Sequence, residues 1–131
     1  DFPHLDDDLG DLPVDLVVGH LGYFRPGKTP EDPGFQALVR LMKAKRCWTK
    51  LTGPYRVSSE SYPYNSVKPF TDFLCSEAAE QLLWGSDWPH VCIKTSMPND
   101  GDLLELLWEW APEPEIRHKI LVENPSRLYG F

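Results

Sequence analysis

Three short, mostly apolar runs stand out along the chain, at residues 14–19, 47–52 and 81–84. Each run ends at or just before a glycine, as strands do when both of their faces are covered and a turn follows. The ends of the runs follow one another at intervals of roughly 30 residues, the size of a strand–helix unit in a parallel sheet. The pattern therefore predicts three parallel strands in an α/β fold.

The segments between and after these runs carry apolar residues at helical spacing. One stripe covers residues 35–42, and a second, at i, i+3 and i+4, covers residues 67–81. Further helices are expected over residues 103–110 and over about residues 113–121. Strands that alternate with helices in this way favour an open parallel sheet or a barrel.

Polar and proline residues predict where the last helices begin and end. Asp102 is expected to cap the helix that follows it, and Pro112 is expected to end that helix. Asn124 is expected to be the N-cap of a short final segment, with Pro125 at its first helical position.

Long loops follow the predicted strands, at residues 21–34, 53–66 and 88–101, and they are rich in glycine, proline and tyrosine. The opposite connections, from helix to strand, are short. Function concentrates on long loops at the carboxyl edge of parallel sheets and barrels. The asymmetry therefore predicts a functional site at that edge.

Composition narrows the class of protein without naming a substrate. A chain of 131 residues with 41% hydrophobic and 25% charged residues suits one globular domain. The net charge of -7 argues against nucleic acid or an anionic membrane as the main partner. Three cysteines without a CxxC pair favour a reducing, cytoplasmic environment. No apolar run approaches the roughly 18 residues that a membrane span requires.

Three side chains at the expected strand ends are candidates for chemistry. His20 follows the first run, Arg56 follows the second, and Asp87 follows the third. An ionised Asp87 could take a proton from water, and Trp84 and Trp88 are expected to dry its surroundings and raise its pKa. The plainer alternatives are a histidine bonded to backbone, a solvated arginine and a capping aspartate.

Other polar residues near these ends have weaker cases. Tyr55 and His90 are candidates for substrate binding, while Tyr62 and Tyr64 either line a ligand pocket or pack the loop. Lys50 lies inside the second run, where a charge needs a partner or a polar strand end. No metal site is predicted, because the sequence has no HxH pair and catalytic zinc uses three protein ligands.

Five segments in sequence order carry a family resemblance: residues 18–22 (VGHLG), 50–56 (KLTGPYR), 84–90 (WGSDWPH), 97–100 (MPND) and 124–131 (NPSRLYGF). Together they resemble the amidohydrolase-related TIM-barrel hydrolases, and within them the 2-pyrone-4,6-dicarboxylate hydrolase-like enzymes. The resemblance covers nearly all of the chain.

The resemblance implies that the three strands are the sixth to eighth of a (β/α)8 barrel. His20 would match the histidine of strand six, and Asp87 the water-activating aspartate of strand eight. Arg56 would match an arginine that contacts a substrate carboxylate. The family opens small carboxylate-bearing cyclic esters, such as pyrone dicarboxylates and sugar-acid lactones. The pyrone hydrolases need no metal, whereas many wider superfamily members bind a divalent metal.

A full barrel needs roughly 250 residues, so residues 1–131 would form only its C-terminal part. Such a part would pair with the missing barrel half or with another copy of itself. The alternative to an enzyme is a truncated, non-catalytic half-barrel that acts as a binding or assembly module. From pattern alone, a doubly wound α/β sheet fits three strand–helix units equally well.

Overall fold

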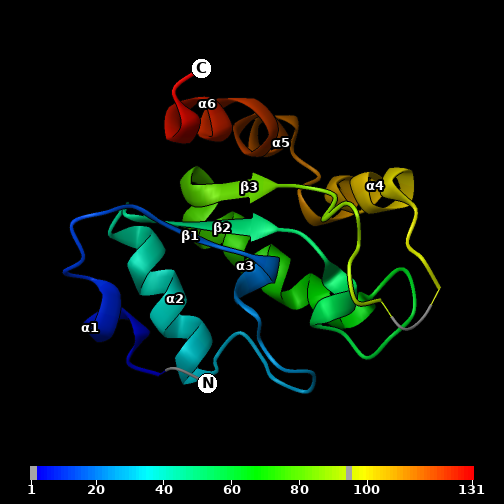
Figure 1. The fold of residues 1–131 in the computed structure, drawn as a ribbon, viewed down its shortest axis with the longest axis horizontal. Coiled ribbons are helices and arrows are strands. Elements are labelled where there is room, and N and C mark those ends of the chain that lie inside the picture. Colours follow the sequence, from blue (N-terminus) through cyan, green and yellow to red (C-terminus); the bar gives the residue numbers. More distant parts are fainter. Residues whose placement is uncertain (1–2, 94–95) are drawn as a thin grey trace.

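The computed structural model describes residues 3–93 and 96–131 and shows a mixed α/β arrangement in that part of the chain. Its sheet has parallel strands in the order β1-β2-β3, namely β1 (Leu16–Val18), β2 (Cys47–Leu51) and β3 (Leu82–Trp84) (Figure 1). Leu16 pairs with Cys47, and Thr49 pairs with Leu82. The predicted strands are confirmed in shortened form, because β1 begins only at Leu16 and Gln81 ends a 3-10 turn before β3.

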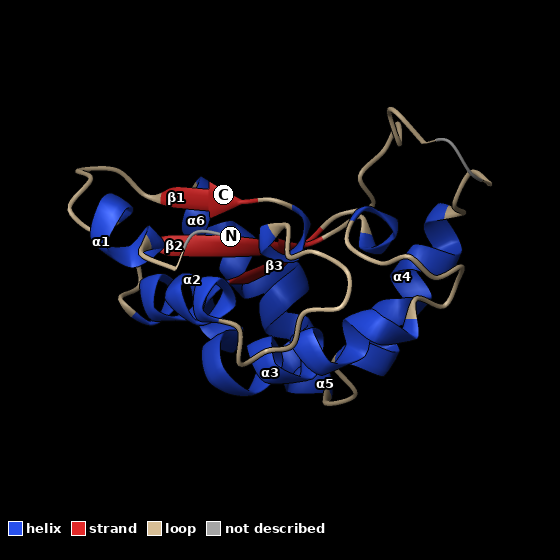
Figure 2. Cartoon of the chain, turned by 90° about the horizontal axis from the view of Figure 1, so that it is seen from below, coloured by secondary structure: helices blue, strands red, loops and turns tan. Residues whose placement is uncertain are grey.

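Helices cover one face of the sheet and its β3 side. Figure 2 shows α2 and α3 beneath the strands, and α6 and the π-helical turn that precedes it (Lys119–Glu123) lie beside β3 in Figure 1. None of the described helices is long and apolar enough to cross a membrane. The helices are α1 (Leu5–Leu9), α2 (Pro33–Lys43), α3 (Lys68–Ala78), α4 (Asp100–Trp110), α5 (Pro114–His118) and α6 (Asn124–Tyr129).

The predicted cap of α4 is wrong. The helix begins at Asp100, and Asn99 is its N-cap, because the Asn99 side chain accepts hydrogen bonds from the backbone N–H groups of Gly101 and Asp102 at 2.8 and 3.2 Å. Asp102 lies inside the first turn, where its negative charge favours the helix N-terminus.

The prediction for Asn124 is also wrong, for a reason that involves the sheet. A π-helical turn (Lys119–Glu123) joins α5 to α6, so the helical backbone continues through Asn124. The buried Asn124 amide donates to the carbonyls of Ala79 and Leu82, both at 2.8 Å. The side chain therefore links α6 to the turn before β3 and to the first residue of β3, and it does not cap a helix.

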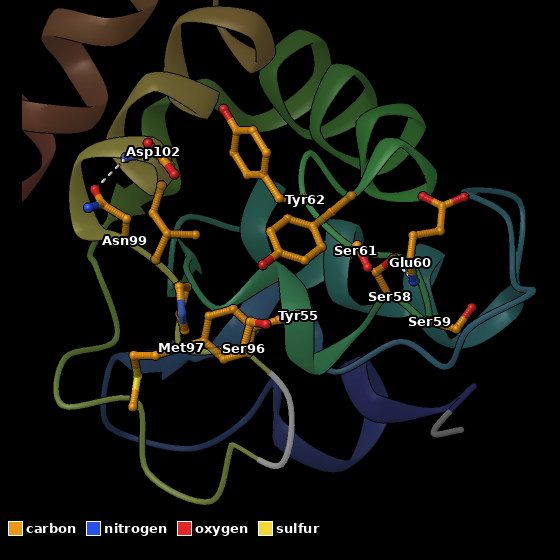
Figure 3. A pocket seen from close by; sticks show the side chains of 13 residues that line it. Tyr55, Ser58, Ser59, Glu60, Ser61, Tyr62, Ser96, Met97, Asn99 and Asp102 are labelled. Carbon is orange, nitrogen blue, oxygen red and sulfur yellow. Dashed lines mark hydrogen bonds between the residues drawn. The ribbon is translucent and has the colours of Figure 1, made fainter.

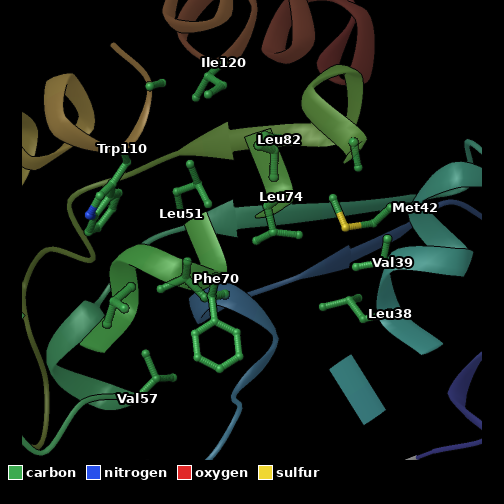
Figure 4. Close-up of a cluster of buried hydrophobic side chains, with 14 of the residues drawn as sticks. Leu38, Val39, Met42, Leu51, Val57, Phe70, Leu74, Leu82, Trp110 and Ile120 are labelled. Carbon is green, nitrogen blue, oxygen red and sulfur yellow. The ribbon is translucent and has the colours of Figure 1, made fainter. Parts of the chain in front are cut away.

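The apolar core lies between the sheet and its helices (Figure 4). Leu51 from β2, Leu82 from β3 and Met42 from α2 are fully buried there, together with Leu74 and Ile120. Burying a leucine or isoleucine side chain contributes about 1.5–3 kcal/mol relative to leaving it exposed. This core fixes the strands from one side, so their carboxyl ends are held at a common edge.

Alternation along β2 places Trp48 and Lys50 on the face away from the core. Cys47 and Leu51 belong to the core, and the Thr49 hydroxyl contacts the Met42 sulfur, whereas Trp48 and Lys50 lie between them in the sequence. The Trp48 ring packs against the Arg127 guanidinium of α6, with 4.8 Å between the guanidinium carbon and the ring centre. On the face away from the core, Lys50 is therefore the side chain of β2 nearest to the carboxyl end of the strand.

Candidate active site

The side chains predicted at three different strand ends meet at one carboxylate. Arg56, in a 3-10 turn after β2, donates from Nε to Asp87 Oδ2 at 2.5 Å. His20, just after β1, places Nε2 3.8 Å from Asp87 Oδ1. Because the strands are parallel, their carboxyl ends share one edge, which is why residues far apart in sequence converge there.

The backbone bends sharply to bring these groups together. His20 and Asp87 both have left-handed conformations, with φ of 45° and 67°, and such conformations are uncommon outside glycine. Gly53, with φ of 55°, lies between them. A Cβ added at Gly53 would lie 2.8 Å from His20 Nδ1 and 3.1 Å from Asp87 Oδ2. Glycine is therefore required for this close approach.

Thr52 fixes the His20 ring and was missed by the sequence reasoning. Its hydroxyl oxygen accepts the backbone N–H of His20 at 3.2 Å and lies 3.0 Å from His20 Nδ1. A hydroxyl that already accepts one bond is well placed to donate its proton to Nδ1, which leaves the proton of a neutral ring on Nε2. That proton then faces Asp87 and the space beside it.

Tyr55 and His90, predicted as substrate-binding residues, lie beside Asp87 and contact each other. The Tyr55 hydroxyl donates to Asp87 Oδ2 at 2.6 Å and lies 2.8 Å from His90 Nδ1. His90 is buried, and its Nε2 lies 3.0 Å from Asp100 Oδ1. Asp100 belongs to the MPND segment that carries the family resemblance, but the sequence assigned it no role in the site.

The expected rise in the pKa of Asp87 is wrong. Burial raises the pKa, but hydrogen bonds from Tyr55 and Arg56 and the nearby positive charges outweigh it and hold the pKa of Asp87 below its usual value. Trp88 is 75% exposed and does not dry the carboxylate. Asp87 is therefore an ionised, strongly hydrogen-bonded group.

The same surroundings shift the neighbours of Asp87. Desolvation lowers the pKa of His20, against the opposing charge of Asp87, so a neutral ring is favoured near pH 7. Burial and the bond to Asp87 raise the pKa of Tyr55, which keeps its hydroxyl protonated. The hydrogen bond to Asp87 raises the pKa of Arg56, so its positive charge is permanent.

An open hollow of about 410 Å³ adjoins His20 and Asp87. Lys50, which had no firm assignment from its position in the sequence, lines it together with Thr52 and Trp84. A small polar molecule placed there would meet the His20 imidazole, the Asp87 carboxylate and a lysine within one space. The hollow thus offers hydrogen-bonding groups and charges of both signs to a small polar molecule.

Tyr62 and Tyr64 lie apart from this hollow. They line a second pocket of about 500 Å³ with Tyr55 and several serines (Figure 3). Tyr64 packs edge-on against both Tyr55 and Tyr62, with ring centres 6.3 and 6.1 Å apart. The two tyrosines therefore pack within the loop and also line this second pocket.

In the described part of the chain, no cluster of three or more histidine, cysteine or carboxylate side chains is placed to hold a metal ion. The three cysteines are all free. Cys47 is buried, and desolvation raises the pKa of its thiol to about 11.

Comparison with known proteins gives a consistent result. The family model described as Amidohydrolase matches residues 1–131. The chain is 43% identical over 125 residues to 4-sulfomuconolactone hydrolase of Hydrogenophaga intermedia, covering 93% of the chain and 41% of that protein. It is 35% identical over 138 residues to 2-pyrone-4,6-dicarboxylate hydrolase of Comamonas testosteroni, covering 98% of the chain and 45% of that protein.

A solved structure agrees in shape. The crystal structure of a probable 2-pyrone-4,6-dicarboxylic acid hydrolase from Acinetobacter baumannii, with citric acid bound, matches with a TM-score of 0.83 and 28% identity. The match covers 99% of this chain and 49% of that one. The chain thus spans less than half the length of each of these three proteins.

Proposed function

Because this chain belongs to the Amidohydrolase family, we propose that it forms the C-terminal part of a hydrolase that opens small, carboxylate-bearing cyclic esters. In this proposal residues 1–131 are one partial domain, and β1, β2 and β3 are the last three strands of a (β/α)8 barrel. The sequential order of the parallel strands supports it, as does the share of about half of each relative that the chain covers.

The observation that carries the proposal is the convergence of His20, Arg56 and Tyr55 on the Asp87 carboxylate at 2.5 to 3.8 Å. In the proposed reaction Asp87 accepts a proton from water as the water oxygen attacks the ester carbonyl. His20 donates a hydrogen bond from Nε2 to the carbonyl oxygen, which stabilises the negative charge that develops there.

Arg56 has two parts in the proposal. Its Nε orients Asp87, and one terminal nitrogen donates to the carbonyl of Val91 at 3.0 Å. A guanidinium has five N–H donors, so others remain for a substrate carboxylate. Lys50, on the wall of the hollow, adds a second positive charge for an anionic substrate. The relatives' names, a sulfomuconolactone hydrolase and a pyrone dicarboxylate hydrolase, support this substrate class.

The test is hydrolysis of a panel of carboxylate-bearing lactones and pyrones by the intact protein. We expect Asp87→Asn to lower turnover by about 10²–10⁴-fold, the usual effect of losing a general base. Asp72→Asn is the matched control, because Asp72 is exposed and pairs only with Lys68 on α3. Near wild-type turnover in Asp87→Asn would sink the assignment.

One observation favours a second candidate, a non-catalytic binding or assembly module. In the described residues β1 and β3 are both edge strands, and unpaired edges invite pairing with another chain. This module would bind a dicarboxylate and pair with the other half of a barrel or with a second copy. Light scattering measures whether the protein pairs with another chain. The fate of added pyrone dicarboxylate, followed by its absorbance, separates the two candidates, because only the enzyme consumes the ligand that it binds.

A further inference from the structure

A chain of polar groups leads from Asp87 away from the hollow. The Tyr55 hydroxyl lies 2.6 Å from Asp87 Oδ2 and 2.8 Å from His90 Nδ1. On the far side of the ring, His90 Nε2 lies 3.0 Å from Asp100 Oδ1. The His90 side chain is 4% exposed and that of Asp100 is 51% exposed. These contacts therefore connect a partly buried carboxylate to the surface.

The chemistry of the four side chains sets the number of protons that their three contacts hold. Each of the three contacts joins two oxygen or nitrogen atoms and needs one proton between them. With both carboxylates ionised, a neutral tyrosine and a neutral imidazole supply only two protons. The three contacts can therefore take one more proton. That proton turns the His90 ring into an imidazolium ion, which donates one hydrogen bond to Tyr55 and one to Asp100.

The capacity for one more proton matters because Asp87 by itself is a weak base for the proton taken from water. Burial raises its pKa, but the bonds from Tyr55 and Arg56 hold the pKa of Asp87 below its usual value. The His90 ring has a nitrogen that can take this proton, and the contact of Nε2 with Asp100 stabilises the positive charge that results. A proton taken from water is therefore better held beyond Asp87 than on it.

We propose that His90, acting through Tyr55, holds the proton that Asp87 removes from water during ring opening, an inference that rests on the proposed function. As Asp87 passes this proton to the Tyr55 oxygen, Tyr55 passes its own hydroxyl proton to His90 Nδ1. Asp87 is again a carboxylate. The reverse shift delivers a proton through Asp87 to the ester oxygen that leaves, so one O–H bond breaks in water and one forms on the product.

Asp100 stabilises the charged form of His90 by accepting from Nε2. It lies in the first turn of α4, close enough to fix the ring orientation. In the described residues, the titratable groups in contact with His90 are Tyr55 from the turn after β2 and Asp100 from α4, and Asp87 and Arg56 lie one contact further. His90 is a positioning and proton-holding residue, because it reaches the reacting atoms only through Tyr55.

The first test needs no turnover. In ¹⁵N-labelled protein, imidazole nitrogen shifts report how much His90 is protonated at a fixed pH in wild type, Asp87→Asn, Tyr55→Phe and the double variant. We expect Asp87→Asn to reduce protonated His90 about threefold or more, and Tyr55→Phe to remove most of that dependence, as coupled sites require. An equal effect of Asp87→Asn with and without the Tyr55 hydroxyl would overturn the proposal.

Two neighbouring acids on α4 supply a matched control for the same measurement. Asp100 and Asp102 both lie in the first turn of α4, where a negative charge is favourable, but of the two only Asp100 contacts His90. Asp100→Asn is expected to reduce protonated His90, and Asp102→Asn is expected to leave it unchanged. Equal effects of the two variants would contradict a specific role of Asp100.

The second test uses turnover of a carboxylate-bearing lactone by the intact protein. We expect His90→Gln to lower kcat about 10–100-fold with little change in KM, and to move the acidic limb of the kcat profile to lower pH. His118→Gln is the control, since His118 is exposed and its side chain pairs with Glu123. A kcat loss with an unmoved acidic limb would mean a structural role. Should no lactone be opened by wild type, the proposed function fails, while the NMR measurement still decides the proton-holding role.

Discussion

Arg56 and Asp87 form an ion pair with 2.5 Å between Nε and Oδ2, although they follow different strands. Both side chains are mostly buried, at 17% and 18% exposure, so water screens the pair little. The pair is part of the reason that the pKa of Asp87 lies below its usual value, against the effect of burial. This contact ties the loop after β2 to the loop after β3.

Replacing Arg56 with methionine should destabilise the fold and flatten its acid dependence. The lost partner leaves a partly buried carboxylate short of a donor, which costs about 1–3 kcal/mol at pH 7. In wild type the lowered pKa of Asp87 contributes stability above the unfolded value of about 4, and this stability is lost as pH falls through the folded pKa. Urea unfolding between pH 7 and pH 3 measures both effects. A pH dependence as steep as that of wild type would contradict the ion-pair account.

Gly53→Ala should be more harmful than the same change at Gly27. Both glycines have positive φ, 55° and 84°, so both variants carry the backbone cost of about 1 kcal/mol. Only at Gly53 does the new methyl group meet the site, at 2.8 Å from His20 Nδ1, whereas nothing lies within 4 Å at Gly27. Thermal unfolding of the two variants should differ by about 1–3 kcal/mol, the usual effect of overpacking. Equal losses would show that the loop relaxes around the methyl group.

The sequence was sufficient for the three strands and for the meeting of His20, Arg56 and Asp87, because parallel strands of even spacing bring their ends to one edge. It was insufficient for the contacts that Thr52 and Asp100 make, since those depend on left-handed turns at His20 and His90 that local pattern does not specify. The direction of the Asp87 pKa shift could not be predicted from the sequence either, because it depends on which side chains of the loops donate hydrogen bonds to the carboxylate.

The helix ends show a similar limit. Asn124 precedes a proline and so has the pattern of an N-cap. Its amide instead donates to the carbonyl of Ala79, in the turn before β3, and to that of Leu82, the first residue of β3. Local propensity was overridden by a tertiary contact more than 40 residues away in sequence.

Asn124→Ala should therefore cost more than an ordinary helix substitution. The change leaves the carbonyls of Ala79 and Leu82 without this donor, and a buried carbonyl that loses its partner costs about 1–3 kcal/mol. Asn65→Ala, at an exposed position in another turn, should change stability by less than about 0.5 kcal/mol. Chemical denaturation measures both, and a small loss at Asn124 would mean that water replaces the amide.

Thr52→Val should impair His20 while leaving the core intact. Valine keeps the shape of threonine but removes the hydroxyl that bonds the His20 backbone and ring. Without that contact the His20 ring loses the bond that favours a proton on Nε2, so hydrolysis of a carboxylate-bearing lactone should fall about 10-fold or more in kcat. Thr49→Val is the matched control, because Thr49 is on the core face of β2 and its hydroxyl contacts the Met42 sulfur. We expect Thr49→Val to retain turnover within about twofold. Equal kcat losses in the two variants would trace the effect to β2 packing and would remove Thr52 from the site.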